Sequence, residues 1–248
     1  MKICEVKMKD YFELRGVDAS DYPPSMPGYI RPYLPPKNNK VIDIGCGYGQ
    51  VLRYLKNQGF ENLLGIDINS NALESLHKCG IPYYNNSNDL LFENRPAIMD
   101  GAHLIIMQHV LEHLPKGAII KTLENIRRSL CDDGFLLVSV PNAQSHTGCY
   151  WAYEDFTHNC LFTAGSLLFV LKAAGFGDVQ IIDADCTYGI SKCKKTLKLI
   201  LSYFYKRQLR FWNKVTSSSF HRPSPQVFSY EVKAIAAKNE LSKLRPEY

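Results

Sequence analysis

The amino-acid sequence predicts an α/β fold in which helices cover both faces of a doubly wound, mostly parallel β-sheet. Three observations lead to this prediction. Short apolar runs of strand character alternate with helical segments from residue 40 onward. The first run enters the first helix through a glycine-rich turn, DIGCGYG. The spacing between successive strands leaves room for a crossover helix, which parallel strands require.

Boundary signals locate the elements in chain order. Asn69 or Ser70 and, later, Thr163 offer the side-chain oxygen that is favoured at a helix N-cap. The fourth strand is followed by a helix that carries Pro115 in its first turn and two arginines near its end. The predicted helices are 48–59, 70–80, 115–130 and 163–176. The predicted strands are 40–45, 62–68, 81–84, 102–108, 134–141, 178–189 and 228–238.

Length and composition favour a single soluble domain. A chain of 248 residues with 46% hydrophobic content can bury one substantial core. Its first residues alternate charged and apolar side chains, unlike a signal peptide, and no apolar run approaches the ~20 residues of a membrane span. The eight cysteines include no C-x-x-C pair, so we expect reduced thiols and a cytoplasmic location. Six of the thirteen prolines lie in 23–36, which predicts an extended lead-in and a domain boundary near residue 38.

The turn DIGCGYG, residues 43–49, places three glycines at alternate positions. Glycine permits positive φ and lets a ligand approach the main chain closely. The spacing G-x-G-x-G differs from the dinucleotide fingerprint G-x-G-x-x-G, whose amides hold a pyrophosphate. Asp43, which precedes the glycines, is suited to an amino group, either directly or through water. The turn therefore predicts a ligand without phosphate, and a simple tight turn is the alternative.

Asp67 closes the second strand, 22 residues after Gly45. A carboxylate at this place in a doubly wound sheet binds both hydroxyls of a ribose. A ligand that combines an adenosine with an amino acid and lacks phosphate is S-adenosylmethionine. Because the glycine turn and Asp67 both fit this ligand, the alternative that the turn has no ligand-binding role is much less favoured.

These segments resemble the class I S-adenosylmethionine-dependent methyltransferases, most closely the branch with VIDIGCGYG, HVLEHL and D-x-x-H-x-x-x-F-T followed by AGF. The resemblance covers residues 39–186 and implies a Rossmann-like sheet of seven strands with an antiparallel last strand. It also implies S-adenosylmethionine as cofactor and S-adenosylhomocysteine as product. The methyltransferase domain is then 39–248, and residues 1–38 resemble a Pro/Tyr-rich lid, although their aromatic residues could equally be ordinary packing.

The resemblance assigns cofactor contacts by position. The glycine turn lines the methionine and ribose, the acid that ends the second strand holds the ribose, and a pair after the third strand contacts the adenine amine. The predicted cofactor-binding residues are Asp43, Gly45, Cys46, Gly47, Gly49, Asp67, Ile68, Asn88, Asp89, Gln108 and His109.

The stretch MQHVLEHLPK contains His109-x-x-Glu112-His113, which by pattern alone is the inverted zinc-peptidase motif. Two imidazoles at i and i+4 need a sustained helix, but a strand runs up to Gln108 and Pro115 follows His113 by two residues. Ligands of such sheets bind beyond the carboxyl ends of the strands. We therefore expect Gln108 and His109 to face the cofactor and His113 to face the acceptor. A structural role and a metal site are the alternatives, and we expect no metal.

A second constellation, YEDFTHNCLFT, follows the fifth strand. Methyl transfer to a hydroxyl requires loss of a proton, and an imidazole with a pKa of ~6.5 is a suitable base. His158 is the candidate base, with Asp155 as its orienter or as a ligand of a substrate hydroxyl. His113, Asn142 and Tyr153 are candidate substrate contacts. Two alternatives stay open: the segment braces the following helix, or proximity alone drives the reaction.

A basic segment interrupts the chain before the last strand. From Gly189 to Tyr230 there are nine Lys or Arg and no Asp or Glu. Apolar residues recur at i, i+3, i+4 and i+7 from Leu197, which predicts an amphipathic helix in an insert at 189–226. Three interpretations compete. The insert covers the active site and binds a phosphorylated substrate, it lies on an anionic membrane surface, or it is a dimer or packing helix.

The sequence thus predicts a small-molecule O-methyltransferase. The proposed acceptor is a hydroxyl of a sugar, nucleotide sugar or related phosphorylated precursor of a bacterial surface polysaccharide, by family resemblance and the cationic insert. The alternatives are a methyltransferase of a quinone-type or other small metabolite, a nucleotide-binding dehydrogenase and a non-catalytic cofactor-binding module. The net charge of +5 is too mild to imply nucleic acid, so we expect none as a partner, no stable membrane insertion and a possible homodimer.

Overall fold

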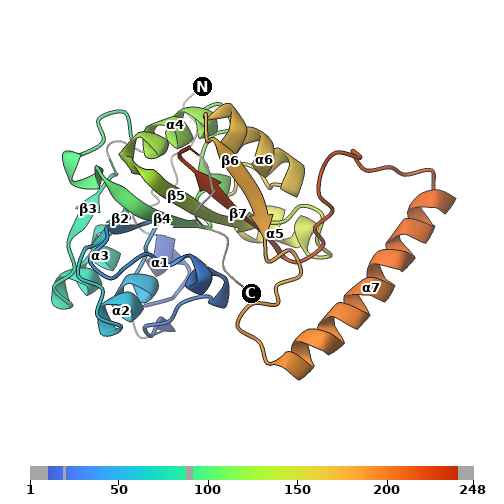
Figure 1. Ribbon diagram of the computed structural model, residues 1–248, viewed down its shortest axis with the longest axis horizontal. Helices are drawn as coiled ribbons and strands as arrows, with labels where there is room; N and C mark the ends of the chain where they lie inside the picture. The colour runs from blue at the N-terminus through green and yellow to red at the C-terminus, as the bar shows by residue number, and fades with distance from the viewer. Residues whose placement is uncertain (1–10, 19–20, 88–91, 240–248) are drawn as a thin grey trace.

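A computed structural model describes residues 11–18, 21–87 and 92–239 (Figure 1). Its centre is a seven-stranded sheet with the order β3-β2-β1-β4-β5-β7-β6. β7 runs antiparallel to both of its neighbours, and the pairings among the other strands are parallel. This confirms the predicted doubly wound architecture. The strands are β1 (Val41–Ile44), β2 (Leu63–Asp67), β3 (Tyr83–Asn85), β4 (Ala102–Gln108), β5 (Leu130–Pro141), β6 (Asp178–Ile182) and β7 (Glu231–Ala237).

Helices lie on both faces of this sheet, except for the last helix, which lies beside the body of the molecule (Figure 1). They are α1 (Tyr11–Leu14), α2 (Gln50–Asn57), α3 (Ser70–Lys78), α4 (Ile119–Ser129), α5 (Gly148–Glu154), α6 (Ala164–Ala173) and α7 (Lys192–Val215). Short 3₁₀ helices occupy Gly28–Tyr33, Ala97–Met99 and Leu111–His113. None of the helices among the described residues combines the length and the apolar character that crossing a bilayer demands.

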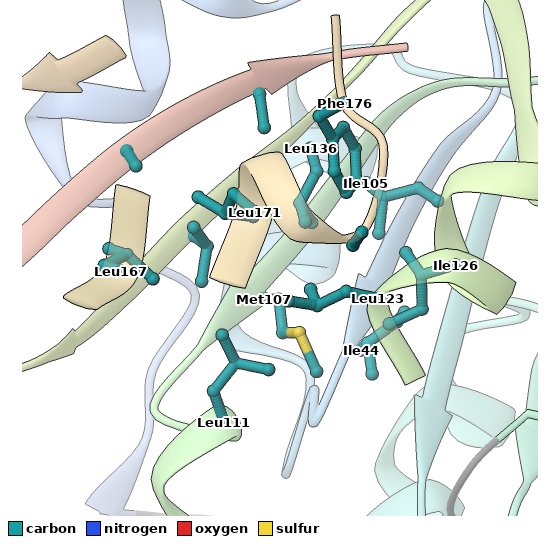
Figure 2. Packing of buried hydrophobic residues seen from close by; sticks show 14 of the residues in the cluster. Ile44, Ile105, Met107, Leu111, Leu123, Ile126, Leu136, Leu167, Leu171 and Phe176 are labelled. Atoms are coloured by element: carbon teal, nitrogen blue, oxygen red, sulfur yellow. The ribbon is translucent and has the colours of Figure 1, made fainter. Parts of the chain in front are cut away.

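Each face of the sheet carries its own core, because side chains alternate between the two faces of a strand. In β4, Ile105 and Met107 belong to the core under α4 and α6, whereas Leu104 and Ile106 belong to the core that α2 and α3 cover. Figure 2 shows side chains of α4 and α6 closing over the first of these faces. Both faces of β4 are therefore buried, which explains its continuous apolar sequence.

Most helix boundaries follow the predicted caps. The Asn69 side chain accepts a hydrogen bond from the backbone N–H of Ala72 at 3.0 Å. Thr163 and Ser166 form a reciprocal capping box at the start of α6. One boundary differs: Pro115 does not lie in the first turn of α4, because a separate turn, closed by Ala118 N–H on the Pro115 carbonyl, precedes the helix.

The lead-in segment is less extended than its prolines predict. Residues 28–33 form a 3₁₀ helix that includes Pro32. Tyr29, Ile30 and Tyr33 are buried and belong to the core on the α2 side of the sheet. Part of the lead-in is thus integral to the core, since proline excludes a regular helix interior but tolerates a short 3₁₀ turn.

Two glycines of the β1–α2 turn are required by the fold itself. Gly45 and Gly49 have φ angles of 72° and 73°. A Cβ atom added to Gly45 would overlap the side chain of Val110, and one added to Gly49 would overlap Leu76. The turn therefore combines a left-handed backbone with close packing, and only glycine satisfies both conditions.

We expect Gly49→Ala to lower the free energy of unfolding by about 3 kcal/mol, because it adds left-handed strain and overpacking together. The measurement is urea unfolding followed by circular dichroism. Gly117→Ala is the matched control, since Gly117 has no neighbouring atom within 4 Å of an added Cβ. Equal stability of the two variants would contradict this account of the turn.

Candidate functional site

The carboxyl ends of the parallel strands open into a cavity of about 1310 Å³. The loops that follow β1, β2, β4 and β5 form its walls, as expected for a doubly wound sheet. Another side is closed by residues that precede the proline-rich lead-in, including Tyr11, Phe12 and Tyr22. The cavity is large enough for a nucleoside-sized ligand together with a second small molecule.

Asp67 ties the two cofactor loops together at the end of β2. Its Oδ2 accepts the backbone N–H of Gly47 and its Oδ1 accepts that of Asn69, each at 2.8 Å. Burial raises the pKa of Asp67, although the hydrogen bonds from Asn69 and Gly47 act in the opposite direction. The carboxylate lines the cavity and holds the glycine turn against the start of α3.

Asp43 is a second buried carboxyl group at the end of the neighbouring strand. It is 4% exposed, and burial together with the charge of Asp67 raises its pKa to about 8. Two carboxyl groups that destabilise each other's ionised forms favour a positively charged ligand between them. A sulfonium and an ammonium group, as in S-adenosylmethionine, therefore suit this wall of the cavity.

His109 follows β4 in a left-handed backbone conformation, with φ of 52°. Its Nε2 lies 2.8 Å from Oε1 of Glu231, and its Nδ1 lies 3.3 Å from Oε1 of Glu112. Burial lowers the pKa of His109, but the two carboxylates outweigh burial and raise it to about 9. His109 is thus a residue in a strained backbone conformation that is held as a cation between two carboxylates, and such strain is typical of functional sites.

Asp155 is the centre of a hydrogen-bond network on the opposite side of the cavity. It accepts the hydroxyl of Tyr11 at 2.6 Å and that of Thr157 at 2.6 Å, and Nη1 of Arg15 lies 3.2 Å away. Burial raises the pKa of Asp155, but the hydrogen bonds from Thr157 and Tyr11 prevail and hold it at about 2. Asp155 is therefore an ionised carboxylate that links the N-terminal residues Tyr11 and Arg15 to the loop after β5.

His113 and His158 lie beside this network, with their ring centroids 4.7 Å apart. The Thr157 hydroxyl donates to Asp155, so Nδ1 of His113, 2.8 Å from that oxygen, is the donor. Nδ1 of His158 lies 2.7 Å from the carbonyl oxygen of Trp151 and must also donate. These assignments follow from the hydrogen-bond partners, and burial lowers the pKa of His113. In the neutral form of each ring, the lone pair is therefore on Nε2.

Glu112 is fully buried between these histidines and His109. Neither of its carboxylate oxygens makes a hydrogen bond within the described part of the chain. Glu112, His113 and His158 each offer one potential ligand atom within 4.8 Å of the others. His158 comes from a loop after β5, so the lack of a sustained helix for His109 and His113 does not exclude a metal held by this cluster. The prediction that no metal is bound therefore needs a chelation experiment.

The structure brings most predicted site residues to one cavity. Those that line it are Asp43, Gly45, Cys46, Gly47, Asp67, Ile68, Gln108, His109, His113, Asp155 and His158. Gln108 also accepts the Tyr29 hydroxyl at 2.9 Å, which joins it to the lead-in. Asn88 and Asp89 lie outside the described residues.

Three predicted residues need correction. Asn142 is fully buried, and its amide donates to the carbonyls of Val227 and Ser229, so it braces the chain and is not open to a substrate. Tyr153 is 80% exposed on α5 and does not line the cavity. Gly49 does not line it either, because it caps α2 and packs on Leu76.

Of the two roles expected for Asp155, that of orienter of His158 is not supported by a hydrogen bond, since Oδ2 and Nε2 are 3.9 Å apart. The Trp151 carbonyl orients His158 instead. Sequence reasoning missed Thr157, Arg15 and Trp151. Thr157 lay inside the quoted motif and was a detectable signal, whereas no local pattern pointed to Arg15, which is 140 positions away from Asp155 along the chain.

Comparisons with known proteins agree with this geometry. A family model described as a methyltransferase domain matches residues 20–181. A sphingolipid C9-methyltransferase of Gibberella zeae is 27% identical over 49% of the chain and 23% of its own length. A tRNA U34 carboxymethyltransferase of Pseudomonas fluorescens is 22% identical over 64% of the chain and 52% of its own length. The chain thus spans about a quarter and about half of these two relatives.

Among solved structures, an S-adenosylmethionine-dependent methyltransferase from Archaeoglobus fulgidus has a similar fold, with a TM-score of 0.60. The two chains are 19% identical, and the similarity covers 91% of this chain and 97% of that one. At this identity, the likeness concerns the fold.

We expect Asp67→Ala to weaken S-adenosylmethionine binding by roughly 100-fold, because charge-assisted hydrogen bonds to the ribose are lost and the glycine turn loses its tie. Isothermal titration calorimetry measures the effect. Asp178→Ala, on the distant strand β6, is the control. If Asp67→Ala binds S-adenosylmethionine as tightly as the wild type, the assignment of Asp67 to the ribose is wrong.

Cofactor affinity should rise with pH. With a pKa of about 8, Asp43 is largely protonated at pH 7 in the free protein. A cationic ligand favours its ionised form, so binding at pH 7 releases a proton, and affinity increases until the pH exceeds about 8. Calorimetry in two buffers of different ionisation enthalpy counts the protons. Asp43→Asn should abolish the proton release, and its persistence would assign the release to another group.

Proposed function

Since this chain belongs to the methyltransferase-domain family and is an S-adenosylmethionine-dependent enzyme, we propose that its methyl acceptor is a hydroxyl group of a sugar, nucleotide sugar or related phosphorylated precursor of a bacterial surface polysaccharide. The observation that carries the hydroxyl assignment is the pair of imidazoles in the wall of the cavity, His113 and His158, whose Nδ1 atoms donate and whose neutral forms therefore have the lone pair on Nε2. Each can accept a proton from a hydroxyl nucleophile.

The cofactor side of the cavity fits S-adenosylmethionine by its chemistry. Two buried carboxyl groups, Asp43 and Asp67, lie where positive charge is needed, and the glycine turn lets the ligand approach the backbone. When bound, the cofactor supplies a methyl group on a positively charged sulfur, which is a good leaving group. The residues of the chain hold the reactants in line and exclude water, which accounts for much of the rate enhancement.

On the acceptor side, His158 is the proposed base. Its Nδ1 is fixed by the Trp151 carbonyl, so the Nε2 lone pair keeps one orientation. The imidazolium that forms on proton transfer is close to the buried carboxylate of Glu112, which stabilises the added charge. Asp155 is a positioning residue, because through Thr157 it fixes the tautomer of His113.

The phosphorylated sugar rests on weaker support than the hydroxyl. Arg15 lines the cavity and offers a cation, and the family resemblance includes enzymes of surface polysaccharides. A quinone-type or other small metabolite is the principal alternative. A nucleotide-binding dehydrogenase and a non-catalytic cofactor-binding module are disfavoured by the family match. We further propose that the enzyme acts in the cytoplasm as a homodimer, without nucleic acid as a partner.

The test is transfer of labelled methyl groups from S-adenosylmethionine to a panel of acceptors: a nucleotide sugar, the same sugar without phosphate, and a catechol as a quinone-precursor analogue. We expect the nucleotide sugar to be methylated best and dialysis against a chelator to leave the rate unchanged. Equal rates with the unphosphorylated sugar would remove the phosphate assignment. Loss of activity on chelation, restored by a divalent cation, would replace the base with a metal held by Glu112, His113 and His158.

We expect His158→Ala to lower kcat by about 100-fold or more while cofactor binding stays unchanged, because only the proton acceptor is removed. His77→Ala is the control, since His77 is exposed on α3. The measurements are steady-state kinetics and calorimetry on the same preparations. A variant that keeps most of its kcat would show that His158 is not the base.

A further inference from the structure

Helix α7 stands apart from the rest of the molecule. It is 24 residues long, and none of its residues is buried. Figure 1 shows it beside the body, beyond α5, and joined to it by a connecting segment at each end. A helix of this length that covers no core needs another reason for its apolar side chains.

One stripe of α7 faces the body. The residues of α7 that are partly covered follow the spacing i, i+3, i+4, i+7 and i+11: Ser202, Tyr205, Lys206, Leu209 and Asn213. Nζ of Lys206 lies 2.7 Å from Oδ1 of Asp185, and the Tyr205 ring lies 5.0 Å from that of His146. On the same side of the helix, Nζ of Lys198 donates to the carbonyl of Cys186 at 2.8 Å. The contacts that hold α7 in place are thus mainly polar or aromatic.

Five of the exposed apolar side chains form another stripe. Leu197, Ile200, Leu201, Phe204 and Phe211 are each between 50% and 62% exposed. With about 100° between successive residues, the centre of this stripe is roughly 150° away from the centre of the body-facing stripe. The fold therefore attaches α7 by its more polar side and directs its apolar side away from the protein.

The charges of α7 all have one sign. The helix carries eight Lys or Arg and no Asp or Glu. Lys194 flanks the apolar stripe on one side, and Arg207 and Lys214 flank it on the other. Long cationic side chains in these positions can reach outward past the apolar residues toward an anionic surface.

We propose that α7 binds the surface of a membrane that contains anionic lipids, with its apolar stripe among the acyl chains and its cations at the headgroups. An exposed apolar stripe with flanking Lys and Arg is the arrangement that interfacial helices use. Trp212, which is 52% exposed, adds an aromatic ring of the kind that favours this interface. The absence of a membrane-crossing helix among the described residues agrees with a helix that lies in the plane of the surface.

Charge argues against the competing occupant, a second copy of α7. Packing two such helices face to face would bring together two sets of eight positive charges with no acidic residue on either helix. Like charges at close range oppose association. An anionic lipid surface supplies the opposite charge, so it is the better complement.

The attachment of α7 lies close in the chain to a residue that lines the cavity. Tyr205 contacts Phe228, with ring centroids 6.1 Å apart, and Tyr230, two residues further on, lines the cavity. Binding through α7 therefore positions the cavity near the lipid surface. This placement suits an acceptor that is attached to lipid. That consequence rests on the proposed function, whereas the proposal that α7 binds a membrane does not.

The experiment is flotation of the full chain with vesicles of phosphatidylcholine alone or of phosphatidylcholine with phosphatidylserine. We expect at least ~10-fold stronger binding to the anionic vesicles and a fall in binding as salt increases. Ile200→Glu/Phe204→Glu should lose this binding at least ~10-fold, because two charges enter the apolar stripe. Phe169→Glu is the matched control, since Phe169 is 66% exposed on α6 and Phe204 is 62% exposed on α7.

Two readouts keep the result separate from folding and from catalysis. Circular dichroism and S-adenosylmethionine calorimetry should match the wild type for both variants, because Ile200, Phe204 and Phe169 are exposed. Equal binding to neutral and anionic vesicles, or equal binding by the Ile200→Glu/Phe204→Glu variant, would overturn the proposal. One further result would overturn the proposal. The wild type would bind no vesicles and would be a dimer, and the Ile200→Glu/Phe204→Glu variant would be a monomer.

Discussion

The proximity of two buried carboxyl groups, Asp43 and Asp67, is the constraint around which the cofactor half of the molecule is organised. Parallel pairing of β1 with β2 brings the ends of these strands to one edge, so their terminal acids become neighbours in a poorly solvated place. Mutual repulsion makes the arrangement unfavourable without a cation. The fold tolerates it because Asp67 accepts two backbone N–H groups that otherwise end without partners at the turn and at the start of α3.

The acceptor half follows a different logic. Its centre is a single ionised carboxylate, Asp155, which three donors from two distant segments stabilise. Because the Thr157 hydroxyl donates its hydrogen bond to Asp155, the Thr157 oxygen can only accept from His113, and this sequence of hydrogen bonds makes Nδ1 the donor of that ring. One half of the cavity thus favours positive charge, and the other presents neutral bases to a nucleophile.

Local patterns predicted the strands and most caps because those features depend on nearby residues. The β1–α2 turn, the Asn69 cap and the seven strands all follow from period, glycine and capping chemistry. Asn142 shows the limit of such reasoning. Its position after a strand suggested a pocket, but its partners Val227 and Ser229 lie 85 and 87 positions away, and no local pattern reports them. The start of α4 was misplaced for a smaller reason, because Pro115 also suits the turn before a helix.

Helix α1 has no buried residue of its own, so its position depends on contacts at its two sides. Phe12 rests on Tyr48 of the glycine turn, with ring centroids 4.7 Å apart, and Tyr11 bonds Asp155 in the acceptor half. A ligand that displaces either contact leaves α1 with fewer contacts to the rest of the protein. The affinities for the two substrates are therefore thermodynamically linked, and by reciprocity each substrate alters the binding of the other to the same degree. The order in which products leave would then depend on which of the two contacts re-forms first.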